Sequence, residues 1–187
     1  LTTSRNSETW QPKLRVEAEA LALHVRRSDK QTQMHEPMDI AVQLKNLRLQ
    51  EPSRLGRDAF KRVDVLARVP KLWLQNQRQA GDILELDRLT LERKNLTLVA
   101  RGTLKLHARG YLQGKLDLNA VNLSALIDAL QEAGLVSPRD RAKWLFFGGL
   151  GAALGGDTQD RVSIPLHFKN GRTLLGPLDL GAAPTWQ

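Results

Sequence analysis

The chain has 187 residues, 28 lysines and arginines against 20 acidic residues, and a formal net charge of +8. It contains no cysteine, which excludes disulfide bonds, zinc–cysteine sites and cysteine nucleophiles. No apolar run reaches the roughly 18 residues that a membrane-spanning helix needs. Only 5% of the residues are aromatic, so we expect an aliphatic core, which suits an elongated sheet better than an enzyme with a deep pocket.

The first strand is predicted to follow a polar end. Residues 1–12 are interpreted as a loose or linking segment, and residues 13–187 as a single β-rich domain. Apolar and polar residues alternate from Leu14 to Ala20, and the alternation continues one residue out of phase from Leu21 to Val25. Such a shift predicts a β-bulge within one long strand. Residues 26–37 are then predicted to form a polar loop.

Alternation then returns repeatedly and predicts an antiparallel meander with one apolar and one wet face. Residues 38–49 and 63–69 read as strands, and Pro70 stops the second of them. From Asp82 to Leu118 leucines alternate with polar residues almost without a pause. We expect breaks in this run at residues 94–95, 101–102 and 110–114.

The period changes after residue 121, where two short helices are predicted. The first covers residues 123–134, with Asn122 or Ser124 as its cap. The second covers residues 138–154 and begins at Pro138, a residue favoured in the first helical turn.

A hairpin is predicted to close the chain. Asn170 and Gly171 stand between two apolar runs, and this dipeptide favours a type I′ turn because both central residues need positive φ. Gly176 and Pro177 then end the second strand. The predicted fold class is therefore α+β and β-rich: a curved antiparallel sheet with two short helices and a C-terminal hairpin.

Motifs for chemistry are missing from the sequence. The four histidines show no metal-ligand spacing, and no serine lies in a nucleophile elbow. The glycines at residues 148–151 match neither a phosphate loop nor a dinucleotide fingerprint. We therefore predict no catalytic residues, no cofactor and no metal site, and we expect a protein that is not an enzyme.

The most hydrophobic stretch is a candidate contact surface, formed by Trp144, Phe146, Phe147 and Leu150. One interpretation is a face that lies on a membrane or lines a lipid-holding surface. The other, which we favour, is a helix that buries these side chains against the sheet. The basic charge admits an anionic membrane surface or nucleic acid as partner, but the meander offers only Tyr111 for base stacking, which argues against nucleic acid.

The order of pieces in the second half resembles a family of bacterial envelope proteins known as domain of unknown function 2125. The resemblance rests on the strand pair of residues 102–118, the helix at 126–135, and the turns at Asn170–Gly171 and Gly176–Pro177. It implies a periplasmic β-rich body held at the inner membrane by an N-terminal anchor that this chain lacks. The family has no assigned activity, so the resemblance supplies no site residues.

Two functions follow as expectations. The first is a non-catalytic periplasmic scaffold whose sheet binds a lipid, another hydrophobic ligand or a partner protein, by fold-level analogy with lipid-conveying proteins of the AsmA type. The alternative is a basic module that binds anionic phospholipid or nucleic acid. The oligomeric state stays open.

Overall fold

The computed structural model describes residues 15–30, 36–50, 60–132, 136–142, 145, 161–176 and 178–185. These residues form one antiparallel sheet of ten strands in the order β1-β3-β4-β5-β6-β7-β8-β9-β10, and β2 also pairs with β3. The elements are β1 Arg15–Glu17, β2 Ala20–Arg27, β3 Pro37–Gln50, β4 Phe60–Pro70, α1 Lys71–Leu74, β5 Ile83–Arg93, β6 Leu96–Leu106, β7 Leu112–Val121, α2 Leu123–Glu132, the 3₁₀ helix η1 Pro138–Asp140, β8 Arg161–Lys169, β9 Arg172–Leu175 and β10 Leu178–Ala182.

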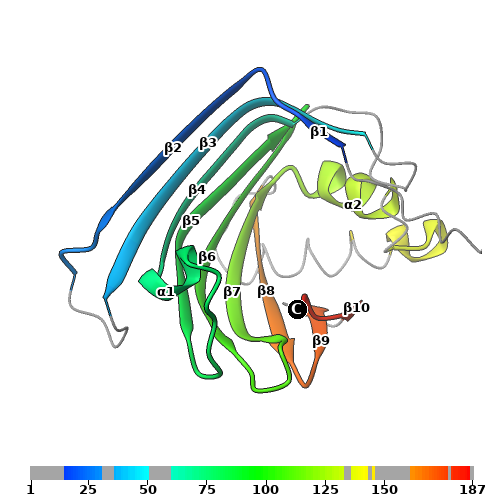
Figure 1. Ribbon diagram of the computed structural model, residues 1–187. Coiled ribbons are helices and arrows are strands. Elements are labelled where there is room, and N and C mark those ends of the chain that lie inside the picture. Colours follow the sequence, from blue (N-terminus) through cyan, green and yellow to red (C-terminus); the bar gives the residue numbers. More distant parts are fainter. Residues whose placement is uncertain are drawn as a thin grey trace, which may run out of the picture.

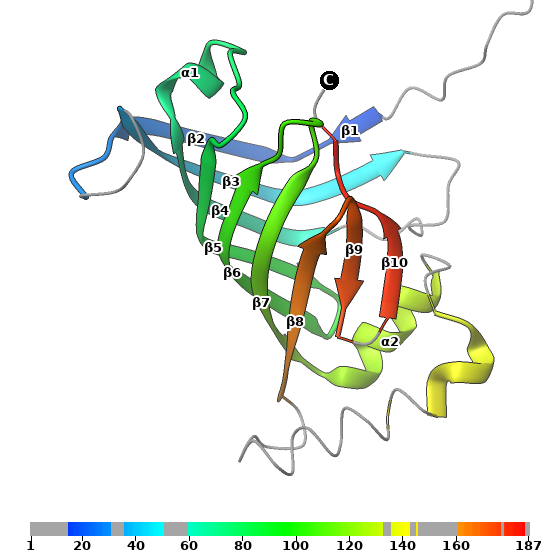
Figure 2. The ribbon, with the colours of Figure 1, turned by 90° about the horizontal axis from the view of Figure 1, so that it is seen from below.

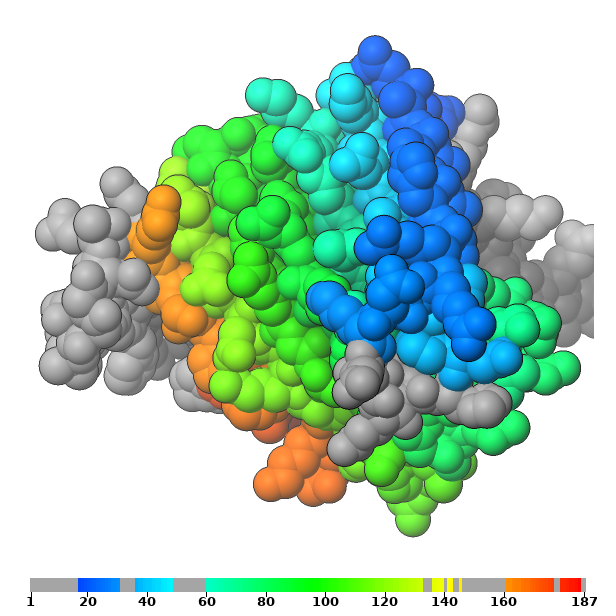
Figure 3. Space-filling model, turned by 90° about the vertical axis from the view of Figure 1, so that its left-hand side faces the viewer, coloured from blue at the N-terminus to red at the C-terminus, as the bar shows by residue number. Residues whose placement is uncertain are grey.

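The sheet is strongly curved, and helix α2 lies on its concave side (Figure 1). The view from below shows β8, β9 and β10 at one side of the sheet, with α2 beneath them (Figure 2). The opposite, convex side presents the strands in order from β2 at one margin to β8 at the other (Figure 3). The predicted class, a curved antiparallel meander with late helices and a C-terminal hairpin, is confirmed.

The break predicted at residues 101–102 is wrong, and the break predicted at residues 110–114 lies partly too late in the chain, because Gly102 and Gly114 are inside strands. β6 runs through Gly102 and β7 runs through Gly114, while the actual turn between them lies at residues 107–110. Gly102 is paired opposite Leu116 and has φ of +151°, and Gly114 is opposite Leu104 with φ of +141°. A Cβ on either glycine would lie 2.2 Å from a backbone carbonyl oxygen of the neighbouring strand. Glycine therefore permits a close approach of the two strands here.

The bulge predicted after Ala20 is also wrong. Glu17 lies opposite Arg48 and Ala20 lies opposite Lys45, so both strands advance three residues between these pairs and no extra residue is inserted. Instead, the alternation of apolar residues on β3 also shifts by one residue directly across from this point, at Asn46, which has φ of +49°. Residues 18 and 19 belong to neither β1 nor β2, and the Glu19 amide bonds to the Lys45 carbonyl at 3.0 Å, so the phase changes here without an extra residue on either side of the pair.

A bulge does occur in β5, between Leu86 and Leu89. Leu86 is opposite Gly102 and Leu89 is opposite Ala100, so β5 contributes one residue more than β6 between these pairs. The bulge returns Leu89 to the face that Leu86 occupies, despite their odd separation in sequence.

The helix starts follow the predicted capping chemistry. The side-chain oxygen of Asn122 accepts a hydrogen bond from the Ala125 amide at 3.0 Å, so Asn122 rather than Ser124 caps α2. Ser137 accepts from the Arg139 amide at 3.2 Å and caps η1, which starts at Pro138. Of the second predicted helix, 138–154, the structure describes η1 and helical residues 141, 142 and 145, and the rest lies outside the described residues. Helix α1 was not predicted.

The closing turn has the predicted geometry. Asn170 has φ of +53° and Gly171 has φ of +73°, so both central residues adopt the left-handed conformation that a type I′ turn requires. Gly176 ends β9 with φ of +55°, and Pro177 lies outside the described residues. The strand β10 that follows was not predicted; it pairs with β9 and extends the sheet by one strand.

A buried arginine ties three strands together on the convex face. Arg68 on β4 is 2% exposed, and its guanidinium lies 3.0 Å from Asp39 of β3 and 2.5 Å and 3.3 Å from Glu85 and Asp87 of β5. The Ser28 hydroxyl accepts a further bond from Arg68 Nε at 2.8 Å. Burial works to raise the pKa of Asp39, but Ser28 and Arg68 outweigh it and hold this pKa below its usual value.

We expect Gly102→Ala to lower the free energy of unfolding by about 1–3 kcal/mol, because its Cβ would overlap the backbone of β7. Urea unfolding followed by circular dichroism measures the loss. Gly181→Ala is the control: Gly181 also has positive φ, at +106°, but a Cβ at this position would meet nothing within 4 Å. An equal loss in both variants would show that the close strand approach does not matter.

We expect Arg68→Met to cost about 3–5 kcal/mol at neutral pH, because it leaves three carboxylates together without their cation. Arg26→Met is the control, since Arg26 also pairs with Asp39 but is 76% exposed, and it should cost less than about 1 kcal/mol.

The same pair of proteins gives a pH test. The pKa of Asp39 is lowered in the fold, so its stabilisation is present above its unfolded pKa, near 4, and is lost as the pH falls through the lower folded value. The deficit of Arg68→Met should therefore shrink as protonation removes the carboxylate repulsion. Urea midpoints at pH 7 and pH 3.5 test this, and a deficit that is constant with pH would contradict it.

Candidate functional site

The pairing register gathers the apolar side chains of seven strands on one face. Residues directly opposite each other in neighbouring strands point to the same side of a sheet. One row of opposed residues crosses from β2 to β8 through Leu21, Leu44, Val63, Leu91, Leu98, Ala120 and Val162. The next row consists of Leu23, Val42, Val65, Leu89, Ala100, Leu118 and Ile164. We call the surface formed by these two rows the apolar face.

The apolar face lies on the concave side of the sheet. Leu126 of α2 packs in one buried cluster with Ala120 and Val162 of the first row. Figure 1 shows α2 inside the curve, so the side chains of both rows point inward. This arrangement is the candidate functional site.

The protein's own elements fill one end of the concave side. Trp73 of α1 joins Val69, Leu104 and Phe168 in a buried cluster that also includes Ala183 near the C-terminus. The Trp73 indole donates a hydrogen bond to the Asp82 carboxylate at 2.7 Å, which fixes the ring where the cluster needs it. Helix α2 covers the other end through its buried Leu126 and Ile127.

The middle of the apolar face is less covered. Val42, Val65, Leu89 and Leu118 in the second row are only partly buried. Exposure rises toward β2, where Leu21 is 66% exposed and Leu23 is 59% exposed. A contiguous, accessible aliphatic surface on a folded protein is typical of sites that contact a partner protein, a membrane or an apolar ligand.

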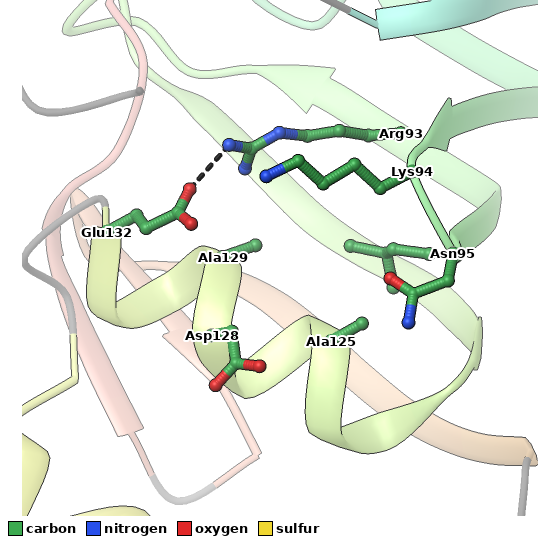
Figure 4. Close-up of a pocket in the computed structure, with 8 residues that line it drawn as sticks. Arg93, Lys94, Asn95, Ala125, Asp128, Ala129 and Glu132 are labelled. Carbon is green, nitrogen blue, oxygen red and sulfur yellow. Dashed lines mark hydrogen bonds and ion pairs between the residues drawn. The ribbon is translucent and has the colours of Figure 1, made fainter. Parts of the chain in front are cut away.

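A small pocket lies between α2 and the turn that joins β5 to β6 (Figure 4). Arg93 at the end of β5 is 7% exposed and binds the Glu132 carboxylate at 2.5 Å, while Lys94 and Asn95 form the turn above the helix. The cavity measures about 110 Å³, which is below the size of typical small-molecule sites. We interpret the Arg93–Glu132 ion pair as a contact that holds the helix end to the sheet.

Trp144, Phe146, Phe147 and Leu150 all lie outside the described residues, so the membrane-facing and buried interpretations of that stretch stay predictions. Leu145 is described and is 38% exposed. Asn170, Gly171 and Gly176 take the structural turn positions predicted for them.

The described histidines lie in separate places. His24 is on β2, His167 is on β8, and His107 stacks on Tyr111 with ring centroids 4.4 Å apart. Within the part of the chain that the structure describes, no group of three or more metal-ligating side chains comes together. No helix in that same part is long and apolar enough to cross a membrane.

Sequence reasoning missed two features of this molecule. The alternation of Leu21, Leu23 and Val25 was recognised, but nothing in it indicated that these residues lie on an outermost strand. The burial of Arg68 was also missed, because it follows from the strands on either side of it. In both cases the missing information is long-range pairing.

Comparison with known proteins gives one match. No curated protein sequence and no solved structure matches the chain. A sequence model of a bacterial family matches residues 1–184, so the relationship also covers the strands before Asp82, beyond the second half in which the resemblance was seen. Because this match spans nearly all of the 187 residues, the chain belongs to the family described as uncharacterised protein conserved in bacteria (DUF2125).

Proposed function

We propose that this protein is a non-catalytic envelope protein that holds a lipid acyl chain, or another hydrophobic ligand, on the apolar face of its curved sheet. The observation that carries the proposal is the continuous run of opposed aliphatic pairs from Leu23 of β2 to Ile164 of β8, much of it only partly buried. A periplasmic location at the inner membrane belongs to the same proposal and rests on the envelope-family resemblance.

The dimensions and chemistry of the apolar face suit an extended hydrocarbon chain. Neighbouring strands lie about 4.8 Å apart, so a row across seven strands spans roughly 30 Å along the sheet. Burying hydrocarbon contributes about 0.8 kcal/mol of binding free energy per methylene. A long acyl chain can therefore bind favourably without any polar contact. Both rows consist of leucine, valine, isoleucine and alanine, which provide contact area but no directional groups.

The uneven filling of the concave side supports the same proposal. Trp73 and α2 occupy the two ends, whereas Val65 and Leu89 in the middle remain partly accessible. A ligand in the middle would contact the curved sheet below it and the packed clusters at either end. The curvature therefore increases the apolar area that one chain can bury.

We expect protein purified from bacterial cells to carry co-purifying lipid, and delipidated protein to bind the fluorescent fatty acid cis-parinaric acid. Val65→Glu should weaken this binding at least about fivefold, because it places a charge among aliphatic contacts. Extraction with mass spectrometry and a fluorescence titration measure the two effects.

Leu66→Glu is the matched control for Val65→Glu. Leu66 follows Val65 on β4, and successive side chains of a strand point to opposite faces, so the Leu66 side chain points to the convex side. It is 41% exposed and lies opposite Arg88. This variant should bind cis-parinaric acid like the wild type, and circular dichroism would confirm that both variants are folded. No bound lipid in the purified protein and no binding of the probe would contradict the proposal.

A second candidate is a basic module for an anionic surface, and the net charge of +8 favours it. On the described convex face, however, several cations have acidic partners: Arg62 lies 2.6 Å from Asp64, and Lys115 lies 2.7 Å from Asp117. Paired charges of both signs give a weaker attraction to phosphate than an unbroken basic patch.

Salt dependence distinguishes the two candidates. We expect the affinity for cis-parinaric acid to stay nearly constant between about 10 and 300 mM salt, because burial of hydrocarbon is not screened. Flotation with phosphatidylglycerol vesicles and titration with an oligonucleotide over the same salt range measure whether the positive charge of the protein drives binding to anionic partners. Strong binding that disappears with salt, together with no uptake of the fatty acid, would favour the basic module.

A further inference from the structure

Strand β2 is an open edge of the sheet. Among the described residues its only partner is β3, with which it pairs continuously from Ala20 to Arg27. These eight residues contain no proline, no glycine and no bulge, which are the devices that usually protect an edge strand. Figure 3 shows β2 along one margin of the molecule.

The backbone groups of alternate residues on β2 point away from the sheet. Ser28, just after β2, donates its amide hydrogen to the carbonyl of Pro37, which lies directly across in the same register. In an antiparallel pair, hydrogen-bonded and non-hydrogen-bonded positions alternate. Counting back from Ser28, the residues at 26, 24, 22 and 20 bond to β3. The amides and carbonyls of Leu21, Leu23 and Val25 are therefore directed to the open side.

The same three residues carry the exposed side chains of the apolar face. Leu21, Leu23 and Val25 are 66%, 59% and 44% exposed. Each lies opposite an apolar residue of β3, namely Leu44, Val42 and Ile40, so their side chains point to the concave side. One strand thus presents both free backbone groups and uncovered aliphatic side chains.

The other edge of the sheet is built differently. β10 has five residues, and its pairing with β9 shifts register between Asp179 and Gly181. Arg172 of β9 holds the Asp179 carboxylate at 2.5 Å on this edge. A short and irregular strand discourages further pairing, whereas β2 is longer and regular and carries its charged residues, Arg26 and Arg27, only at its C-terminal end.

We propose that β2 pairs antiparallel with β2 of a second copy of this chain, about a two-fold axis that passes beside Leu23. In this register Leu23 faces Leu23 of the other copy, and Leu21 faces Val25. All of these are positions with outward backbone groups, so they form hydrogen-bonded pairs and the two sheets join into one. The proposal does not depend on the identity of any ligand.

Charge complementarity favours a second copy over an unrelated strand. Glu19 lies one residue before β2, where its amide bonds to the Lys45 carbonyl and its exposed carboxylate accepts a hydrogen bond from Asn46 of β3. If the pairing with the other copy extends by this one residue, Glu19 comes opposite Arg27 of that copy, and the symmetry creates this pair twice. Opposite charges across a strand pair are stabilising, and like charges would oppose it. The strand is therefore complementary to itself in its apolar residues and in its charges.

The joined sheets would share one concave surface. Directly opposed residues lie on the same face, so Leu23 and its symmetry mate continue the second row from one copy into the other. The exposed aliphatic area of β2 would become the centre of a longer apolar face. Burial of Leu21 and Leu23 supplies the hydrophobic gain for the pairing.

Disulfide trapping tests the register of the proposed β2–β2 pair. Because the 187 residues contain no cysteine, each variant carries only the thiol that is introduced. In Leu23→Cys the two cysteines would face each other with Cα atoms about 5.5 Å apart, within the range of a disulfide. In the control Val25→Cys, on the same strand and face, they would lie roughly 14 Å apart. We expect at least about tenfold more linked dimer for Leu23→Cys after mild oxidation of the 187-residue chain.

Two further measurements complete the test. A mixture of Leu21→Cys and Val25→Cys chains should form the mixed dimer, because these positions face each other across the axis. Light scattering should show that the wild-type chain dimerises at micromolar concentration and that Glu19→Arg weakens this, with Arg27→Glu restoring it in the double variant. A wild-type monomer at 100 µM, or equal trapping of Val25→Cys and Leu23→Cys, would overturn the proposal.

Discussion

The pairing register of the sheet is the constraint on which the rest of this structure depends. A slip of one residue in any strand would turn its leucines and valines from the concave to the convex side. The register prevents this from β2 to β8, even where the sequence departs from strict alternation. In β5 a bulge between Leu86 and Leu89 restores the phase, and near Asn46 of β3 the phase shifts without an extra residue on either side of the pair. The single apolar face therefore depends on local irregularities, such as this bulge and this shift, that keep the apolar side chains on one side of the sheet.

The convex face reinforces the same register by electrostatics. Arg68 is almost fully buried, and removing such a charge from water is costly unless its partners are close. Its carboxylate partners come from β3 and β5, on either side of its own strand. Any slip of β4 against these neighbours would separate the guanidinium from them. Desolvation of Arg68 offsets much of what these ion pairs contribute in the native register, but in any other register the buried charge would lose its partners, so the cluster distinguishes one pairing from its alternatives.

The sequence contained the local features of this fold and lacked the long-range ones. Alternation predicted the strands, and Asn170–Gly171 predicted its turn, because both signals depend on neighbouring residues. Gly102 and Gly114 were mistaken for breaks, since glycine serves both turns and close strand approach, and only the facing strand distinguishes the two. The edge position of β2 and the burial of Arg68 arise from strand order, which alternation does not encode.

An aliphatic surface that remains accessible is a thermodynamic cost, and this sheet has it in two places. In the middle of the apolar face, around Val65 and Leu89, the curvature surrounds the surface, so a slender flexible chain fits better there than a second sheet. Along β2 the surface is exposed and, among the described residues, its outward backbone groups have no strand partner, which a hydrocarbon cannot supply but a strand can. The two proposals therefore assign different partners to the two regions, although one face connects them. A ligand that extended along the second row would reach Leu23, where self-pairing of β2 would decide whether its path ends or continues into another copy.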